Sequence, residues 1–233
     1  MDQTDQPNRL LSAQDIAEME KLTVDRVTEA IDAGDLEGAK KLARRMYNEF
    51  LSMHDLYRDW TVATLSFVGR RFGDQVLEEA MDAGVKAWWG PNLEKMPQEP
   101  AALRARVKMF AAGIKAHLQP LHIEEDDEKI VMQMRPCGSG GRLVIEGKYE
   151  GPDAMYTVQG PQLLTYGRKD FPVYCAHEPL MELQDIKAHG APFVVIEPAH
   201  EIGKQHCNFI IYKDKSKVPA KYYERLGLKK PEA

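Results

Sequence analysis

The three cysteines, all in the second half of the chain, are the residues best suited to chemistry. Cys137 begins a glycine-rich turn, Cys175 precedes an Ala-His-Glu segment, and Cys207 directly follows a histidine. Thiolate sulfur and imidazole nitrogen are the ligands that zinc and iron select, and three or four of them suffice for a site. The chain has no paired C-x-x-C motif, so such a site would have to be assembled by the fold from distant segments.

We predict that Cys137, Cys175, His177 and Cys207 bind zinc or iron as a set of three thiolates and one imidazole. Neighbouring side chains of a strand point to opposite faces, so His206 and Cys207 cannot both reach one ion unless a bulge intervenes. His177 lies at a predicted helix start and has no such restriction. If only three of these residues bind, the open position could hold an activated water. His206 stays as a substitute ligand or as a general acid and base.

Two further residues are candidates for acid–base catalysis. His54 follows Phe50 by four residues and precedes Tyr57 by three, which places it on or beside the apolar seam of its helix. A partly buried histidine there could act as an acid or base. Glu178 directly follows His177, and we assign it to the same catalytic group. The competing interpretation is a hydrogen-bonded core histidine for His54, and small buried hydrophobes for the cysteines.

A glycine-rich segment separates the first two cysteines. From Gly138 to Asp170 there are seven glycines and few periodic apolar residues. Loops of this length are usually lids, binding loops or disordered segments. We predict a mobile cover over the site that carries Arg142, Tyr166 and Arg168 toward a small anionic substrate, because arginine binds carboxylates bidentately. A surface excursion without function is the alternative.

The first half of the chain carries helix signals almost throughout. Ser12 begins a capping box, and Asp35 can cap the segment that follows Gly34. Apolar residues then recur at steps of three and four, which is the helical period. Glycine and proline punctuate the pattern at Gly90-Pro91 and again at Pro120. Helices are predicted over residues 13–34, 35–73 as one or two helices, 74–88, and 101–118.

The character of the chain changes after Pro120. Apolar residues alternate in two segments that flank an acidic turn, which predicts a hairpin, and a short apolar run near residue 195 suits a central strand. The fold class we expect is α+β, a helical N-terminal half packed on a small, mostly antiparallel sheet with a long glycine-rich loop. Strands are predicted over 121–124, 129–134, 193–197 and 207–212, and a helix over 179–189. The organisation we expect is a flexible tail over 1–12, a helical region over 13–118, and an α+β region over 119–233 that carries the Cys/His cluster.

Composition places the chain among ordinary globular proteins. Its 233 residues are 43% hydrophobic and 29% charged, with a formal net charge of −5. Basic residues are spread along the chain, which makes nucleic acid an unlikely partner class, and no apolar run is long enough for a membrane span. We therefore expect a cytoplasmic protein with a small-molecule substrate, with self-association left open. In a reducing compartment, three cysteines are better explained as free thiols or ligands than as disulfides.

The cysteine contexts together resemble a known family. A cysteine follows the first strands, a second starts a helix, and the closing segment reads Gly203-Lys204-Gln205-His206-Cys207-Asn208-Phe209. This arrangement, over roughly residues 120–213, resembles the L-2-amino-thiazoline-4-carboxylic acid hydrolase-like family. The resemblance implies hydrolytic opening of a small ring, and it marks Cys137, Cys175 and Cys207 as the cysteines of the site.

These observations favour a small-molecule hydrolase or lyase that acts on a C–N or C–S bond of a small anionic, for example heterocyclic, compound. A Cys/His metal site would activate water for the reaction. Two alternatives stay open. One is a metal-free enzyme whose cysteine nucleophile is paired with His177 or His206. The other is a ligand-binding or redox-sensing module whose metal is structural.

Overall fold

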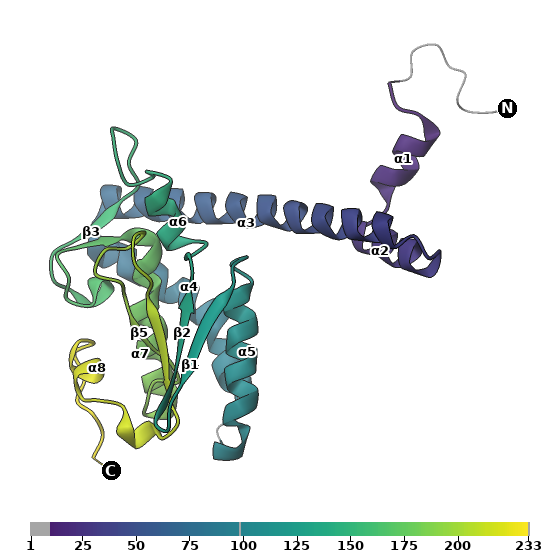
Figure 1. Ribbon diagram of the computed structural model, residues 1–233. Coiled ribbons are helices and arrows are strands. Elements are labelled where there is room, and N and C mark those ends of the chain that lie inside the picture. The colour runs from purple at the N-terminus through teal and green to yellow at the C-terminus, as the bar shows by residue number, and fades with distance from the viewer. Residues whose placement is uncertain (1–9, 98, 233) are drawn as a thin grey trace. The chain divides into compact units, whose positions relative to one another are not determined.

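The structure is a computed structural model that describes residues 10–97 and 99–232 (Figure 1). Residues 1–9, most of the predicted flexible tail, therefore lie outside the described residues. The chain divides into two compact units, Met1–Tyr57 and Arg58–Ala233. Its architecture is α+β, as predicted. No helix among the described residues is long and apolar enough to cross a membrane.

The first unit consists of α1 (Ala13–Glu20), α2 (Thr23–Asp32) and the first part of α3 (Leu36–Phe72). The capping box is confirmed, because Ser12 and Asp15 bond each other's backbone N–H groups. The Asp35 cap is confirmed as well, since the carboxylate accepts from Gly38 N at 2.9 Å. The single helix predicted over 13–34 is wrong: backbone dihedrals turn extended between α1 and α2. Neither helix buries a side chain, so packing does not enforce continuity.

The second unit opens with the end of α3, followed by α4 (Asp74–Lys95). Helix α3 is continuous, which settles the choice between one helix and two. Helix α4 runs through Pro91, whereas the sequence predicted a stop at Gly90-Pro91. Trp89 and Leu93 are both buried. Their packing on either side of Pro91 offsets the backbone hydrogen bond that proline removes.

A four-stranded antiparallel sheet has the order β1-β2-β6-β5. The predicted hairpin is confirmed, and its alternating residues Ile130, Met132 and Met134 are buried. The strand predicted to be central lies at the sheet edge instead. It is apolar because each of its two faces packs in a different hydrophobic core. Ile196 belongs to the larger core, and Val195 belongs to the smaller one. The strands are β1 (Leu121–Glu125), β2 (Lys129–Met134), β5 (Val195–Glu197) and β6 (Asn208–Tyr212).

Helices cover the sheet and build two cores. The larger core joins the sheet to α4, α5 (Leu103–Lys115) and α7 (Glu178–His189). Phe110 of α5, for example, packs edge-on against Phe193 at 5.8 Å between ring centroids. The smaller core joins the other sheet face to α8 (Lys221–Glu224). Helix α7 ends before Gly190, which has a φ of +74°, as predicted from its glycine stop.

The glycine-rich segment is a packed substructure, so the predicted mobile cover is wrong. It contains α6 (Gly140–Ile145), β3 (Thr157–Gln159) and a 3-10 turn over Leu163–Thr165. Strand β3 pairs with β4 (Asp170–Pro172) as a second, two-stranded sheet. Leu143, Val158 and Leu164 are fully buried. These anchors are too widely spaced to form a periodic pattern.

We expect Arg168→Ala to destabilise this substructure. The two terminal guanidinium nitrogens donate to the carbonyls of Ala199 and His200, each at 2.6 Å, and the guanidinium stacks over Phe171. Hydrogen bonds from a charged donor are worth about 1.5–3 kcal/mol each, and about 1 kcal/mol shifts the melting temperature of a domain of this size by roughly 2–4 °C, so losing both should lower the melting temperature by at least about 6 °C. Lys169→Ala, at an exposed neighbour, is the matched control for thermal unfolding. Equal melting temperatures for the two variants would contradict this structural role.

Candidate active site

A cavity of about 310 Å³ in the second unit brings the predicted metal set together. Cys137, Cys175, His177 and Cys207 all line it, and so does Glu178. The cysteines arrive from three chain segments: the end of the hairpin, the turn before α7, and the residue before β6. The rest of the wall is largely apolar and comes from α4, α5, α7 and the sheet: Trp88, Trp89, Met96, Met109, Phe110, Ile114, Met134, Met181, Ile196 and Phe209.

Two consecutive glycines let the backbone approach two of the thiols. A Cβ on Gly140 would lie 2.4 Å from Cys175 Sγ, and a Cβ on Gly141 would lie 2.8 Å from Cys137 Cβ. Neither distance is tolerated by real side chains. The Gly-Gly step at the start of α6 therefore sets the spacing between this backbone and the two cysteines.

We expect Gly140→Ala to disturb the site and lower stability. The added methyl group would displace the buried Cys175 sulfur, and overpacking of this kind typically costs about 1–3 kcal/mol. Gly84→Ala is the matched control, because nothing lies within 4 Å of a Cβ at this exposed α4 position. Alanine there should instead raise stability by a few tenths to about 1 kcal/mol. Denaturant unfolding of both variants checks the contrast, and equal stabilities would contradict it.

Cys137 is the thiol with the richest set of backbone donors. Its sulfur accepts from Gly141 N at 3.3 Å. Burial raises the Cys137 pKa, whereas the N–H groups of Gly141, Ser139 and Gly140 act in the opposite direction. The thiol is thus protonated at neutral pH, but a thiolate formed during a reaction would be met by these N–H donors.

The other two thiols lie in less favourable surroundings for a thiolate. Burial raises the pKa of Cys175 well above its usual value, and the charge of Glu178 adds to this effect. Burial also raises the pKa of Cys207 to about 12, although its sulfur accepts from Ala199 N at 3.3 Å. Both side chains therefore stay protonated at neutral pH.

Glu178 has unmet hydrogen-bonding capacity inside this cavity. Its Oε2 is buried and has no hydrogen-bond partner among the described residues. Burial, with a further contribution from Glu182, raises the Glu178 pKa to about 8, so the carboxyl is protonated at neutral pH. Glu182 differs, because it accepts from Tyr166 Oη, Ile196 N and the Arg225 guanidinium. Glu178 is therefore the carboxyl group that is ready to bond a ligand.

His177 is a neutral imidazole of defined tautomer. Burial lowers its pKa. Its Nδ1 lies 2.6 Å from the Tyr174 carbonyl oxygen, and because a carbonyl can only accept, Nδ1 carries the hydrogen. The Nε2 lone pair can then accept a proton or bind a metal, since metal-bound histidines commonly donate their other N–H to such a carbonyl.

The four predicted ligands do not form a ready metal site. Over the part of the chain that the structure describes, no group of three or more His, Cys, Asp or Glu side chains is placed to hold a metal ion.

Two cavity residues were missed by the sequence reasoning. His117 Nδ1 and Ser139 Oγ lie 2.5 Å apart, and both residues line the cavity. Ser139 stands between two glycines, which was the available signal, since short side chains between glycines often face a ligand. His117 lies just after α5, and no sequence motif around it marks it as a site residue.

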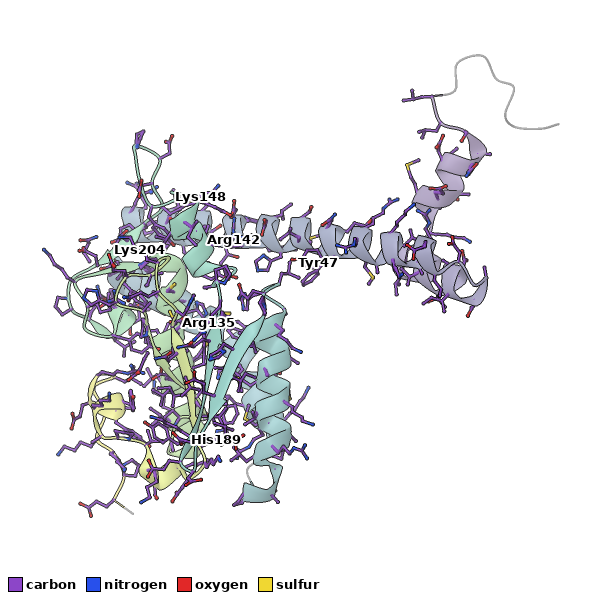
Figure 2. The ribbon with its side chains drawn as sticks, viewed as in Figure 1. Tyr47, Arg135, Arg142, Lys148, His189 and Lys204 are labelled. Atoms are coloured by element: carbon purple, nitrogen blue, oxygen red, sulfur yellow. The ribbon has the colours of Figure 1, made fainter. Side chains whose placement is uncertain are left out.

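The predicted substrate-binding residues are not brought to the thiols. Arg168 and Tyr166 line a second, more open pocket, where the Tyr166 hydroxyl donates to Glu182 at 2.7 Å. Arg142 of α6 is labelled in Figure 2. Its Nε lies 3.2 Å from Glu146 Oε1 in an ion pair, and it lines neither pocket.

The two other histidines that the sequence predicted for the site, His54 and His206, do not line the thiol cavity. His206 lines the second pocket while Cys207 lines the first, in agreement with the expectation that these neighbours face opposite ways. His54 belongs to the first unit, and its Nδ1 lies 3.0 Å from Asp55 Oδ1.

Comparisons with protein-family models, with curated proteins and with solved structures find no match to this chain.

Proposed function

We propose that the protein is a metal-free thiol enzyme that hydrolyses a C–N or C–S bond of a small, ring-containing compound. Cys137 is the nucleophile and Glu178 carries the proton. The observation that supports this most is the pairing, in one apolar cavity, of a thiol under backbone N–H groups with a buried carboxyl group that lacks a partner.

The thiol and the carboxyl group together allow an addition that separates no charge. The Cys137 sulfur bonds to the carbon of a C=N group, the π electrons move to nitrogen, and nitrogen takes the Glu178 proton. The same carboxyl group receives the thiol proton through its other oxygen. An apolar site favours this neutral transfer, because isolated charges are costly there. The Gly141 N–H stabilises the partial negative charge that sulfur carries in the transition state, while the thiol proton is still moving to the carboxyl group.

The following steps restore the enzyme. The tetrahedral carbon expels its nitrogen or sulfur leaving group, which takes a proton from Glu178, while the nitrogen that stays on the carbon re-forms its C=N bond and gives its proton back to Glu178. Water then adds across this C=N bond, with its oxygen on the carbon and one proton on the nitrogen. The C–S bond to Cys137 breaks, the C=O bond of the product forms, and the second water proton returns to the thiol. The net reaction is hydrolysis, with no oxidant or reductant.

The cavity wall favours a ligand whose buried part is uncharged. No lysine or arginine lines the cavity in the described part of the chain, so the anionic group expected from the sequence would have no cationic partner there. The Trp89 indole N–H is buried without a hydrogen-bond partner among the described residues. A ligand acceptor facing Trp89 and a ligand nitrogen facing Glu178 would satisfy both groups.

A substrate panel tests this function. Purified protein is incubated with thiazolines, cyclic ureas, thioethers and thioesters, and product is followed by mass spectrometry. We expect turnover of a ring compound that contains a C=N or C–S bond, with no loss of rate after dialysis against a chelator. No turnover of any member by folded protein would count against the proposal.

A metal-dependent enzyme is the second candidate, because three thiols and a carbonyl-bonded imidazole share one cavity. Metal analysis of the purified protein separates the two candidates. One zinc or iron per chain, lost in Cys175→Ser and needed for turnover, would favour the metal enzyme. Turnover by metal-free protein favours the thiol enzyme.

A further inference from the structure

The first unit lacks a core of its own. Among its described residues only Ala39 is buried, and neither α1 nor α2 buries a side chain. Helices as short as α1 and α2 are marginal in water without tertiary packing. The unit nevertheless exposes many large apolar side chains: Leu10, Leu11, Met19, Leu22, Val24, Ile31, Leu36, Met46, Phe50, Met53 and Leu56. Its helices therefore need a covering surface.

The apolar residues of α3 follow a heptad pattern. Ala43, Met46, Phe50 and Met53 are separated by steps of three, four and three. This spacing places them along one seam of the helix, as in helices that pack lengthwise against another helix. The side chains at 46, 50 and 53 are 40%, 48% and 50% exposed, so the seam is open to a partner.

The apolar face is broader than a two-stranded seam requires. Leu56, which flanks the seam, is 54% exposed, and Val24 and Ile31 of α2 are 48% and 54% exposed. Helices with wide apolar faces are typical of bundles, in which each helix contacts two neighbours. A helical pair that meets an identical pair can supply these neighbours.

We propose that the first unit is a dimerisation module, in which the apolar face of α2 and α3 is covered by the same face of a second copy of the chain. Large side chains that are about half exposed offer roughly 100 Å² each. Eight of them, Leu22, Val24, Ile31, Leu36, Met46, Phe50, Met53 and Leu56, therefore offer roughly 800 Å² per copy, which is what a standard stable interface buries on each partner.

Symmetry supports a second copy as the occupant. In a two-fold symmetric dimer, the same surface patch of both copies forms the interface. An apolar seam on one copy therefore packs against the identical apolar seam of the other. Four helices, two from each copy, then enclose a shared core that a single copy does not have. This inference is independent of the chemistry proposed for the cavity.

The test measures the mass of the full-length protein by light scattering during size exclusion at 1–100 µM. We expect a dimer, twice the chain mass of 26.4 kDa. The double variant Phe50→Glu/Met53→Glu should weaken dimerisation at least about 100-fold, because it places charges in the apolar seam. Asn48→Glu is the matched control: it adds a charge to an exposed α3 position outside the seam and should leave the dimer intact.

A photocrosslinking amino acid at position 53 keeps the test decisive if the double variant fails to fold. Two differently tagged full-length chains are mixed, equilibrated and irradiated. A crosslink between the two tags, mapped to residues 22–57, supports the module. A monomer at every concentration, a dimer unaffected by the double variant, or crosslinks confined to one chain would overturn it.

Discussion

Cys137→Ser is expected to reduce turnover at least about 1,000-fold while leaving the fold intact. Serine keeps the size and the Gly141 hydrogen bond, but its hydroxyl is a far weaker nucleophile in a site that has no charged base to activate it. Steady-state kinetics on the best panel substrate measure the effect, and circular dichroism checks the fold.

Cys175→Ser and Cys207→Ser serve as matched controls for this result. Among the described residues, no backbone N–H donates to the Cys175 sulfur, and one, that of Ala199, donates to the Cys207 sulfur. Each variant should therefore keep its turnover within about tenfold of that of the native protein, once turnover is corrected for the fraction of the variant that is folded. Equal losses in all three variants would indicate that the thiols act as one set, as in a metal site.

Glu178→Gln is expected to lower turnover by about 100- to 10,000-fold, the range of general acid–base catalysis. Glutamine keeps the shape and can still donate a hydrogen bond, but it cannot transfer the proton. In the native protein, turnover should fall as pH rises through about 8, since the protonated carboxyl group is the active form. The residual turnover of the variant should not fall as pH rises through about 8. If it still falls, the group that titrates near pH 8 is not Glu178.

The same substitution should raise stability, and more so at higher pH. The folded-state pKa of Glu178 is raised from 4.5 to about 8, so the folded protein holds a proton that the unfolded chain has lost between these values. Stability therefore decreases as pH rises from 4.5 to 8 and then levels off. A tenfold change in proton affinity corresponds to about 1.4 kcal/mol, which puts the full effect on the order of a few kcal/mol.

Thermal unfolding at pH 4.5, 6 and 8 measures this effect. The difference in melting temperature between Glu178→Gln and the native protein should grow with pH over this window. Glu94→Gln, at an exposed position on α4, is the control and should show no such trend. A constant difference would mean that Glu178 is ionised at neutral pH.

Elements whose boundaries depend on neighbouring residues, such as turns and helix ends, were predicted from the sequence. The acidic turn and alternating residues predicted the hairpin, and the glycine stop predicted the end of α7 at Gly190. The convergence of Cys137, Cys175 and Cys207 followed from their places at element ends. Strands β2 and β6 are antiparallel neighbours, so the end of β2, near Cys137, and the start of β6, next to Cys207, lie at the same edge of the sheet.

Features that depend on tertiary packing could not be predicted. Helix α4 continues past Pro91 because Trp89 and Leu93 are buried on either side of it. Their burial depends on residues distant in sequence, so local sequence signals could not predict it. The glycine-rich segment folds around Leu143, Val158 and Leu164, which are anchored by partners distant in sequence. The interactions of Arg142, Tyr166 and Arg168 with Glu146, Glu182 and Ala199 could not be predicted for the same reason.

Acid-quenched mass spectrometry of the turning-over enzyme tests the central proposal most directly. The native protein is mixed with the best panel substrate, quenched within milliseconds to seconds, and digested for peptide mapping. We predict a substrate-derived mass on the peptide that contains Cys137, which disappears as substrate is exhausted and is absent from Cys137→Ser. Sustained turnover with no adduct on Cys137, retained in Cys137→Ser, would contradict the proposal.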